Sequence, residues 1–221
     1  MSSSPIKLQA VKRAEADFPT KFGHFRILGF EGNERDPETC RPEAAVAIVM
    51  GDIHAGPPLV RVHSQCLTGD VFHSLRCDCR QQLELALQTI AEIGAGILLY
   101  EQKEGRGIGL IAKLQAYELQ DQGLDTVEAN EKLGFKADQR EFELPVAVLR
   151  AMGVHEVRLM SNNPHKVSAL EFAGIRVVER VPCEPTVGER SAAYLKTKKE
   201  KLGHLLGKDD SGRREKSKTI K

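Results

Sequence analysis

The sequence lacks the long apolar segments that mark membrane and secreted proteins. No apolar run of signal-peptide length stands near Met1, and no span approaches the roughly 20 apolar residues that cross a bilayer. The 221 residues carry a net charge of only +1, so the chain has no overall field that attracts nucleic acid. We therefore expect a cytoplasmic protein with no membrane or nucleic-acid partner, whose anionic ligands are small and bound locally.

Several familiar motifs are also missing. The chain has no internal repeat, no Walker A loop, no dinucleotide-binding glycine fingerprint and no C-x2-C pair. What it does contain is enough apolar material for a core, since 41% of its residues are hydrophobic. A chain of this length forms one large domain or two small ones.

Apolar patterning predicts a strand-rich first third followed by alternation. We expect strands at Gly23–Phe30, Ala44–Gly51 and Leu59–Ser64, a loop at Asn33–Pro42, and a strand or loose arm at Lys7–Asp17. Beyond them, helices are predicted at Asp78–Ile93, Gly109–Gln122, Thr126–Leu133, Pro145–Met152, His165–Phe172 and Ser191–Leu206, and strands at Gly96–Tyr100, Val157–Met160 and Ile175–Val181. This order predicts an α/β (mixed α+β) fold around a mainly parallel or mixed sheet.

The densest chemical feature is the stretch Arg61–Gln82, which holds Cys66, Cys77 and Cys79. Thiolates placed where a loop enters a helix suit a borderline metal such as zinc. Structural zinc sites usually have four protein ligands, whereas catalytic sites keep one position for water. Three sulfurs therefore favour an open site, although His63 or His73 could complete the shell.

Two other interpretations of the cysteines stay open. Cys66 could form a disulfide with Cys77 or Cys79, but a reducing compartment disfavours structural disulfides. The thiols could also be inert core residues. We rank zinc ahead of both.

Three loops and one tyrosine are further candidates. Glu104–Gly109 offers glycines, Arg106 and a following helix N-terminus, which together suit a phosphate, although a plain surface turn fits nearly as well. Lys136–Arg140 holds Asp138 and Arg140, and Ser161–Lys166 joins a strand to a helix, a frequent ligand position. Tyr117 follows the helical spacing of Leu110 and Leu114, which by pattern alone indicates a core residue.

Taken together, these residues resemble the GTP cyclohydrolase II family of riboflavin biosynthesis. The resemblance rests on RVHSQCLTGDVFHSLRCDC, GILLYEQKEGRGIGL, KLQAYELQDQGLDTVEAN, LGFKADQREF, VRLMSNNPHKV and YLKTKKEKLGHLL. It implies a catalytic domain at 18–206, and the composition of the two ends indicates an N-terminal arm at 1–17 and a disordered basic tail at 207–221. The chain is too short for the dihydroxybutanone phosphate synthase domain that some members carry, so we expect it to be monofunctional.

The resemblance also implies roles for individual residues. Cys66, Cys77 and Cys79 match the ligands of one zinc ion per subunit, Asp138 the proton acceptor, Arg140 the nucleophile toward the α-phosphorus, and Tyr117 a tyrosine of the ring-opening step. We leave open whether Arg140 acts covalently or as a phosphate clamp, since guanidinium stays protonated. The positions matching GTP contacts are Arg61, Val62, His63, Ser64, Gln65, Gln82, Glu104, Gly105, Arg106, Thr126, Ser161 and Lys166. Family members bind magnesium with the triphosphate and form homodimers.

The implied reaction opens the guanine ring of GTP and releases formate and diphosphate. Three positions depart from the family pattern: Gln65 stands for Glu, Arg80 for Gly and Ser161 for Thr. Two alternatives remain, namely a paralogue that keeps the formyl group and a zinc-stabilised nucleotide- or RNA-binding module without turnover.

Overall fold

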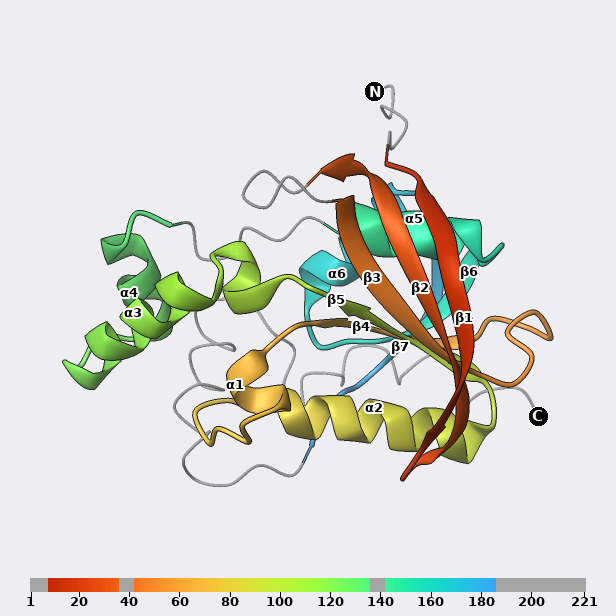
Figure 1. The fold of residues 1–221 in the computed structure, drawn as a ribbon, viewed down its shortest axis with the longest axis horizontal. Coiled ribbons are helices and arrows are strands. Elements are labelled where there is room, and N and C mark those ends of the chain that lie inside the picture. The colour runs from red at the N-terminus through yellow and green to blue at the C-terminus, as the bar shows by residue number, and fades with distance from the viewer. Residues whose placement is uncertain (1–7, 36–41, 136–141, 186–221) are drawn as a thin grey trace, which may run out of the picture.

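The computed structural model describes residues 8–35, 42–135 and 142–185 of the chain. In these ranges one seven-stranded sheet has the strand order β1-β2-β3-β5-β4-β6-β7 (Figure 1). The strands are β1 (Ala10–Thr20), β2 (Gly23–Arg35), β3 (Pro42–Met50), β4 (Leu59–Ser64), β5 (Gly96–Glu101), β6 (Glu156–Met160) and β7 (Arg176–Val181). Neighbours from β1 to β5 pair antiparallel, and those from β5 to β7 pair parallel. The predicted mixed α/β fold is confirmed.

Six α-helices and one 3-10 turn accompany the described sheet. They are α1 (Leu67–Asp70), α2 (Cys79–Ile93), η1 (Glu104–Gly107), α3 (Leu110–Asp121), α4 (Thr126–Lys132), α5 (Glu143–Ala151) and α6 (Pro164–Phe172). The five predicted helices that fall within the described ranges are present to within about two residues at each end. Sequence patterning missed α1 and η1 because each spans a single turn, too short for a periodic pattern. No described helix is both long and apolar enough to cross a bilayer.

Both faces of the sheet are covered, which explains the continuous apolar sequence of β5. Ile97 and Leu99 of β5 pack into the larger core with α5 and α6. Leu98, between them, belongs to the smaller core with Ile90 of α2. Side chains alternate along a strand, so successive residues of β5 reach opposite helical layers.

Two parts of the described fold differ from the sequence expectations. The loop predicted at Asn33–Pro42 is wrong for its first three residues and for its last, because β2 continues to Arg35 and pairs there with Pro42, where β3 begins. The backbone N–H of Asn33 also donates to the Gln9 carbonyl. Backbone hydrogen bonds to neighbouring segments therefore hold residues 33–35 in a strand, although their composition favours a turn.

Helix α3 lies off to one side of the sheet with α4 (Figure 1). The sequence predicts that the apolar residues of α3 at helical spacing belong to the core, and this is wrong for Leu114, which is 42% exposed. Helix α3 packs against α4 and η1, so its periodicity reflects those neighbours and a pocket rather than the main core.

Candidate active site

A pocket opens where the carboxyl ends of the parallel strands β4, β5 and β6 meet. The first residues after parallel strands commonly bind ligands, because loops and helix N-termini gather at that edge. The lining combines sulfur, cationic, amide and hydroxyl side chains: Arg61, His63, Ser64, Gln65, Cys66, Arg76, Cys77, Cys79, Gln82, Glu104, Gly105, Ile108, Lys113, Ala116, Tyr117, Gln120, Thr126, Asn130, Ser161, Asn162, Asn163 and Lys166.

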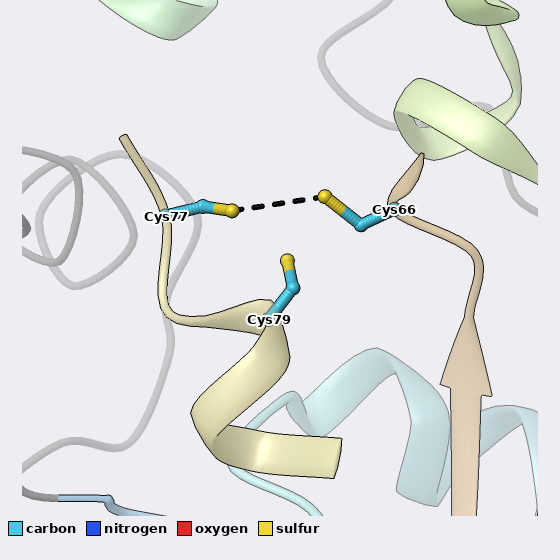
Figure 2. Close-up of side chains that lie close together, drawn as sticks. All are labelled: Cys66, Cys77 and Cys79. Carbon is cyan, nitrogen blue, oxygen red and sulfur yellow. Dashed lines mark hydrogen bonds between the residues drawn. The ribbon is translucent and has the colours of Figure 1, made fainter. Parts of the chain in front are cut away.

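Three cysteines from two segments converge in this pocket. Cys66 directly precedes α1 and Cys79 begins α2, so their thiols meet that of Cys77 at the N-terminal ends of these two helices (Figure 2). All three sulfurs lie within 4.8 Å of one another. The Sγ atoms of Cys66 and Cys77 are 3.6 Å apart, close to the roughly 3.8 Å between two sulfurs bound tetrahedrally to zinc. The thiols are free, so the disulfide interpretation is wrong for them.

The donor set therefore fits zinc. Within the described ranges, this candidate ligand group holds three cysteines and neither His63 nor His73. The backbone of Gly69 closes the space behind the sulfurs, since a Cβ there would lie 2.9 Å from the Cys77 sulfur and 3.1 Å from that of Cys66. Only glycine lets the chain approach the sulfur group so closely.

Hydrogen bonds among the three thiols shift their pKa values in opposite directions. Hydrogen bonds from Cys77 and Cys79 hold the pKa of Cys66 far below its ordinary value, despite partial burial. The same bonds raise the pKa of Cys77 to about 11, and that of Cys79 is raised well above its usual range. A metal that binds all three as thiolates therefore releases protons.

A lysine outside the cysteine segments reaches the sulfur group. The Lys113 ammonium of α3 donates to the Cys66 sulfur at 3.1 Å and to Oε1 of Glu104 at 2.8 Å. The other carboxylate oxygen of Glu104 accepts from the backbone N–H of Leu67 at 2.6 Å. Burial lowers the pKa of Lys113, but the hydrogen bond to Glu104 and the Cys66 charge outweigh it, so the net shift is upward.

Asp70 organises the buried side of the pocket. Its carboxylate accepts from the backbone N–H of Cys66 at 3.0 Å and from the Tyr100 hydroxyl at 2.9 Å, and it lies 3.3 Å from Nε2 of His63. Burial lowers the pKa of His63, which keeps the imidazole neutral. Among the described residues, Nδ1 of His63 and Nε of Arg61 are buried without a hydrogen-bond partner. Both residues line the pocket.

Tyr117 faces the pocket rather than the main core. Its hydroxyl lies 3.2 Å from that of Thr68, which is 3.7 Å from the Cys66 sulfur. The Arg76 guanidinium covers the Tyr117 ring at 4.8 Å. Burial raises the pKa of Tyr117, so the phenol stays protonated near neutral pH.

Most predicted ligand contacts share this pocket. Arg61 donates to the Gln82 amide oxygen at 2.5 Å, and Lys166 donates to the Val62 carbonyl at 2.8 Å. Ser64, Gln65, Gly105, Thr126 and Ser161 also line the pocket. The Val62 side chain instead lies in the core.

Three further predictions cannot be placed in this pocket. Asp138 and Arg140 lie outside the described residues. The backbone of Arg106 belongs to η1, but the described structure does not extend to its side chain.

The sequence analysis did not single out several residues of the site. Lys113 stands four residues before Tyr117 on α3, and Asp70 four residues after Cys66, so helical spacing could have found both. Asn162 and Asn163 fall in the Ser161–Lys166 segment, where Asn163 caps α6.

The structure shows where two departures from the family pattern lie. The Arg80 guanidinium donates to the Asp70 carbonyl at 2.7 Å and pairs with Glu84. It therefore reinforces the end of α1 without joining the pocket lining. Gln65 does line the pocket and follows β4 directly.

Comparisons with known proteins identify relatives of this chain by sequence. A family model described as GTP cyclohydrolase II matches residues 11–182. A curated GTP cyclohydrolase-2 of Proteus mirabilis is 53% identical over 92% of this chain and 98% of its own length. One from Escherichia coli is 54% identical over 91% of this chain and 100% of its own. A solved two-domain 3,4-dihydroxy-2-butanone 4-phosphate synthase from A. baumannii aligns at 20% identity and TM-score 0.46, over 80% of this chain and 41% of that one.

Proposed function

The chain belongs to the GTP cyclohydrolase II family, and on this premise we propose how its pocket carries out the reaction. The enzyme hydrolyses GTP, opens the imidazole ring of guanine and releases formate and diphosphate. The product is 2,5-diamino-6-(ribosylamino)-4(3H)-pyrimidinone 5'-phosphate, the first intermediate of riboflavin biosynthesis.

One observation carries the proposal. Three free thiols that could hold a metal lie in the same pocket as buried polar atoms without protein partners. The carbon that must be attacked lies between two ring nitrogens and needs an activated water. Cys66, Cys77 and Cys79 would hold a zinc ion, which when bound would supply Lewis acidity and an activated water near neutral pH.

The chain's own residues bind and orient the nucleotide. Arg61 and Lys166 supply positive charge for an anionic ligand, and contacts to Gln82 and the Val62 carbonyl hold them in place. The neutral His63 presents Nδ1 as an acceptor if Nε2 donates to Asp70. Guanine offers N–H donors for such an acceptor and carbonyl and ring-nitrogen acceptors for the Arg61 donor.

Tyr117 acts as a proton donor or orienting group. Its phenol is protonated and lies beside Thr68, next to the sulfur group. We assign it to the ring-opening step that ends in formate release. From the family pattern we retain Asp138 as proton acceptor, and Arg140 as a phosphate clamp or nucleophile. Magnesium on the triphosphate and a homodimeric assembly complete the proposal.

Product analysis with GTP, zinc and magnesium tests the function. We expect the parent to release formate and diphosphate, and mass spectrometry to find the deformylated product. Cys77→Ser should lose both zinc and formate release, whereas Cys183→Ser, the same change at a cysteine outside the sulfur group, should keep them. Formate release by a zinc-free Cys77→Ser variant would exclude metal catalysis, and a product that keeps its formyl group would identify the paralogue.

A further inference from the structure

The contact between Lys113 and the sulfur group is not explained by binding of the nucleotide. Lys113 is 12% exposed in its side chain, and it brings a cation from α3 to a sulfur 47 residues earlier in the chain. Burying an ammonium is unfavourable unless it is paired. Its described partners are the Cys66 sulfur, the Glu104 carboxylate and the ring of Tyr117, whose centroid is 5.7 Å away.

Glu104 holds the lysine in this position. Its Oε1 accepts from Lys113 and from the backbone N–H of Gly105, and its Oε2 accepts from the Leu67 N–H. Leu67 is the first residue of α1, directly after Cys66. The carboxylate therefore joins the lysine to the same short segment that carries the sulfur, so the N–H···S contact is fixed from both sides.

We propose that Lys113 is a positioning residue of the metal centre, which tunes the Cys66 thiolate through a charge-assisted hydrogen bond held by Glu104. Three thiolates outweigh the charge of a divalent ion. An N–H donor draws electron density from one of them, so the metal keeps more of its positive charge for an open coordination position. Groups that hydrogen-bond to metal ligands commonly change metal affinity by about 10- to 100-fold.

This inference rests on the proposed zinc site, and metal binding without substrate tests it. Lys113→Met keeps the length of the side chain and removes the donor. Lys132→Met is the matched control, since Lys132 is an exposed lysine of the neighbouring helix α4 and lies outside the pocket lining. Zinc affinity is measured by competition with a chromophoric chelator. Without the lysine, Cys66 is no longer held in its place in the sulfur group, and we expect this loss to outweigh the stronger donation of the freed thiolate. Lys113→Met should therefore bind zinc about 10- to 100-fold more weakly than the parent, and Lys132→Met should bind it equally well.

Cobalt(II) in place of zinc gives a second readout, which separates tuning from a merely structural role. A thiolate without its hydrogen bond gives up charge to the metal more easily, so its sulfur-to-cobalt band should move to longer wavelength in Lys113→Met. The band should return toward the parent position in Lys113→Arg, which keeps a donor. Glu104→Gln, which loosens the lysine, should shift the band in the same direction but less.

The outcomes distinguish this inference from the proposed function. Unchanged zinc affinity and an unshifted cobalt band in Lys113→Met would overturn the inference while leaving the zinc site intact. Equal losses of affinity in Lys113→Met and Lys132→Met would also overturn it, because a general charge effect would then suffice. A parent protein that binds neither zinc nor cobalt would remove the inference and the proposed function together.

Discussion

Replacing Gly69 by alanine tests the geometry of the sulfur group. The new Cβ would lie 2.9 Å from the Cys77 sulfur and 3.1 Å from the Cys66 sulfur. Ordinary contacts begin near 3.4 Å, so the closer sulfur must move by about half an ångström. Metal sites tolerate deviations of only about 0.2 Å in ligand distance. The substitution therefore interferes with the metal-bound arrangement in particular.

The expected loss of zinc affinity depends on whether the strain acts on the metal-free or on the metal-bound form. Without metal, the thiols can rotate away from the methyl group, whereas metal binding draws them back against it. Overpacking typically costs about 1–3 kcal/mol, which corresponds to zinc binding weaker by about 5- to 150-fold. Helix propensity acts in the opposite direction, because alanine is favoured over glycine by up to about 1 kcal/mol. Unfolding of the metal-free Gly69→Ala variant should therefore change little.

Chelator competition measures the affinity, with Gly56→Ala as the matched control. A Cβ at Gly56 meets no atom within 4 Å, so this variant should bind zinc like the parent. Formate release at low zinc concentration should fall in Gly69→Ala and recover when zinc is added in excess. Parent-like zinc affinity in Gly69→Ala would refute the placement of Gly69 against the sulfurs.

Three further predictions concern the surroundings of the sulfur group. Tyr117→Phe, which removes the hydroxyl beside Thr68, should lower kcat by about a hundredfold or more and change the free energy of unfolding by only about 1 kcal/mol. Burial lowers the pKa of His63 from 6.5, so the unfolded chain binds more protons than the folded one. In metal-free protein the free energy of unfolding should therefore fall as pH drops below about 6.5, and His63→Gln should reduce this dependence. Arg80→Ala, which loses the bond to the Asp70 carbonyl, should lower stability by about 1 kcal/mol in urea unfolding while zinc stays bound.

Different results would contradict each expectation. Tyr117→Phe is measured by formate release with mass spectrometry, and parent-like turnover would show that the phenol takes no part in the chemistry. Urea unfolding from pH 7.5 to 5.5 checks His63, and an unchanged pH slope in His63→Gln would assign the loss to other groups. For Arg80→Ala, loss of zinc with unchanged stability would mean that Arg80 acts on the sulfur group and not on the end of α1.

The sequence alone determined much of the local structure. Strand β4 was predicted with its observed bounds, because apolar residues bounded by turn residues need no distant partner to be recognised. Helix α2 was equally clear from its apolar face and from Gly94, which ends it with φ 80°. The spacing of Cys66, Cys77 and Cys79 next to that helix was enough to predict them as candidate metal ligands. The order of these motifs along the chain also pointed to the family.

The tertiary structure decided which distant residues share the site. Strand β5 lies between β3 and β4 in the sheet although β4 precedes it in the chain, and this order brings the Glu104 loop beside Cys66. Lys113 owes its role to a contact across that junction with a sulfur 47 residues earlier in the chain, which periodicity and composition do not encode. The expectation for Leu114 is wrong because α3 packs against α4 and η1 rather than against the main core. Local patterns report the conformation of neighbours in sequence, whereas contacts between remote segments depend on how the sheet brings them together.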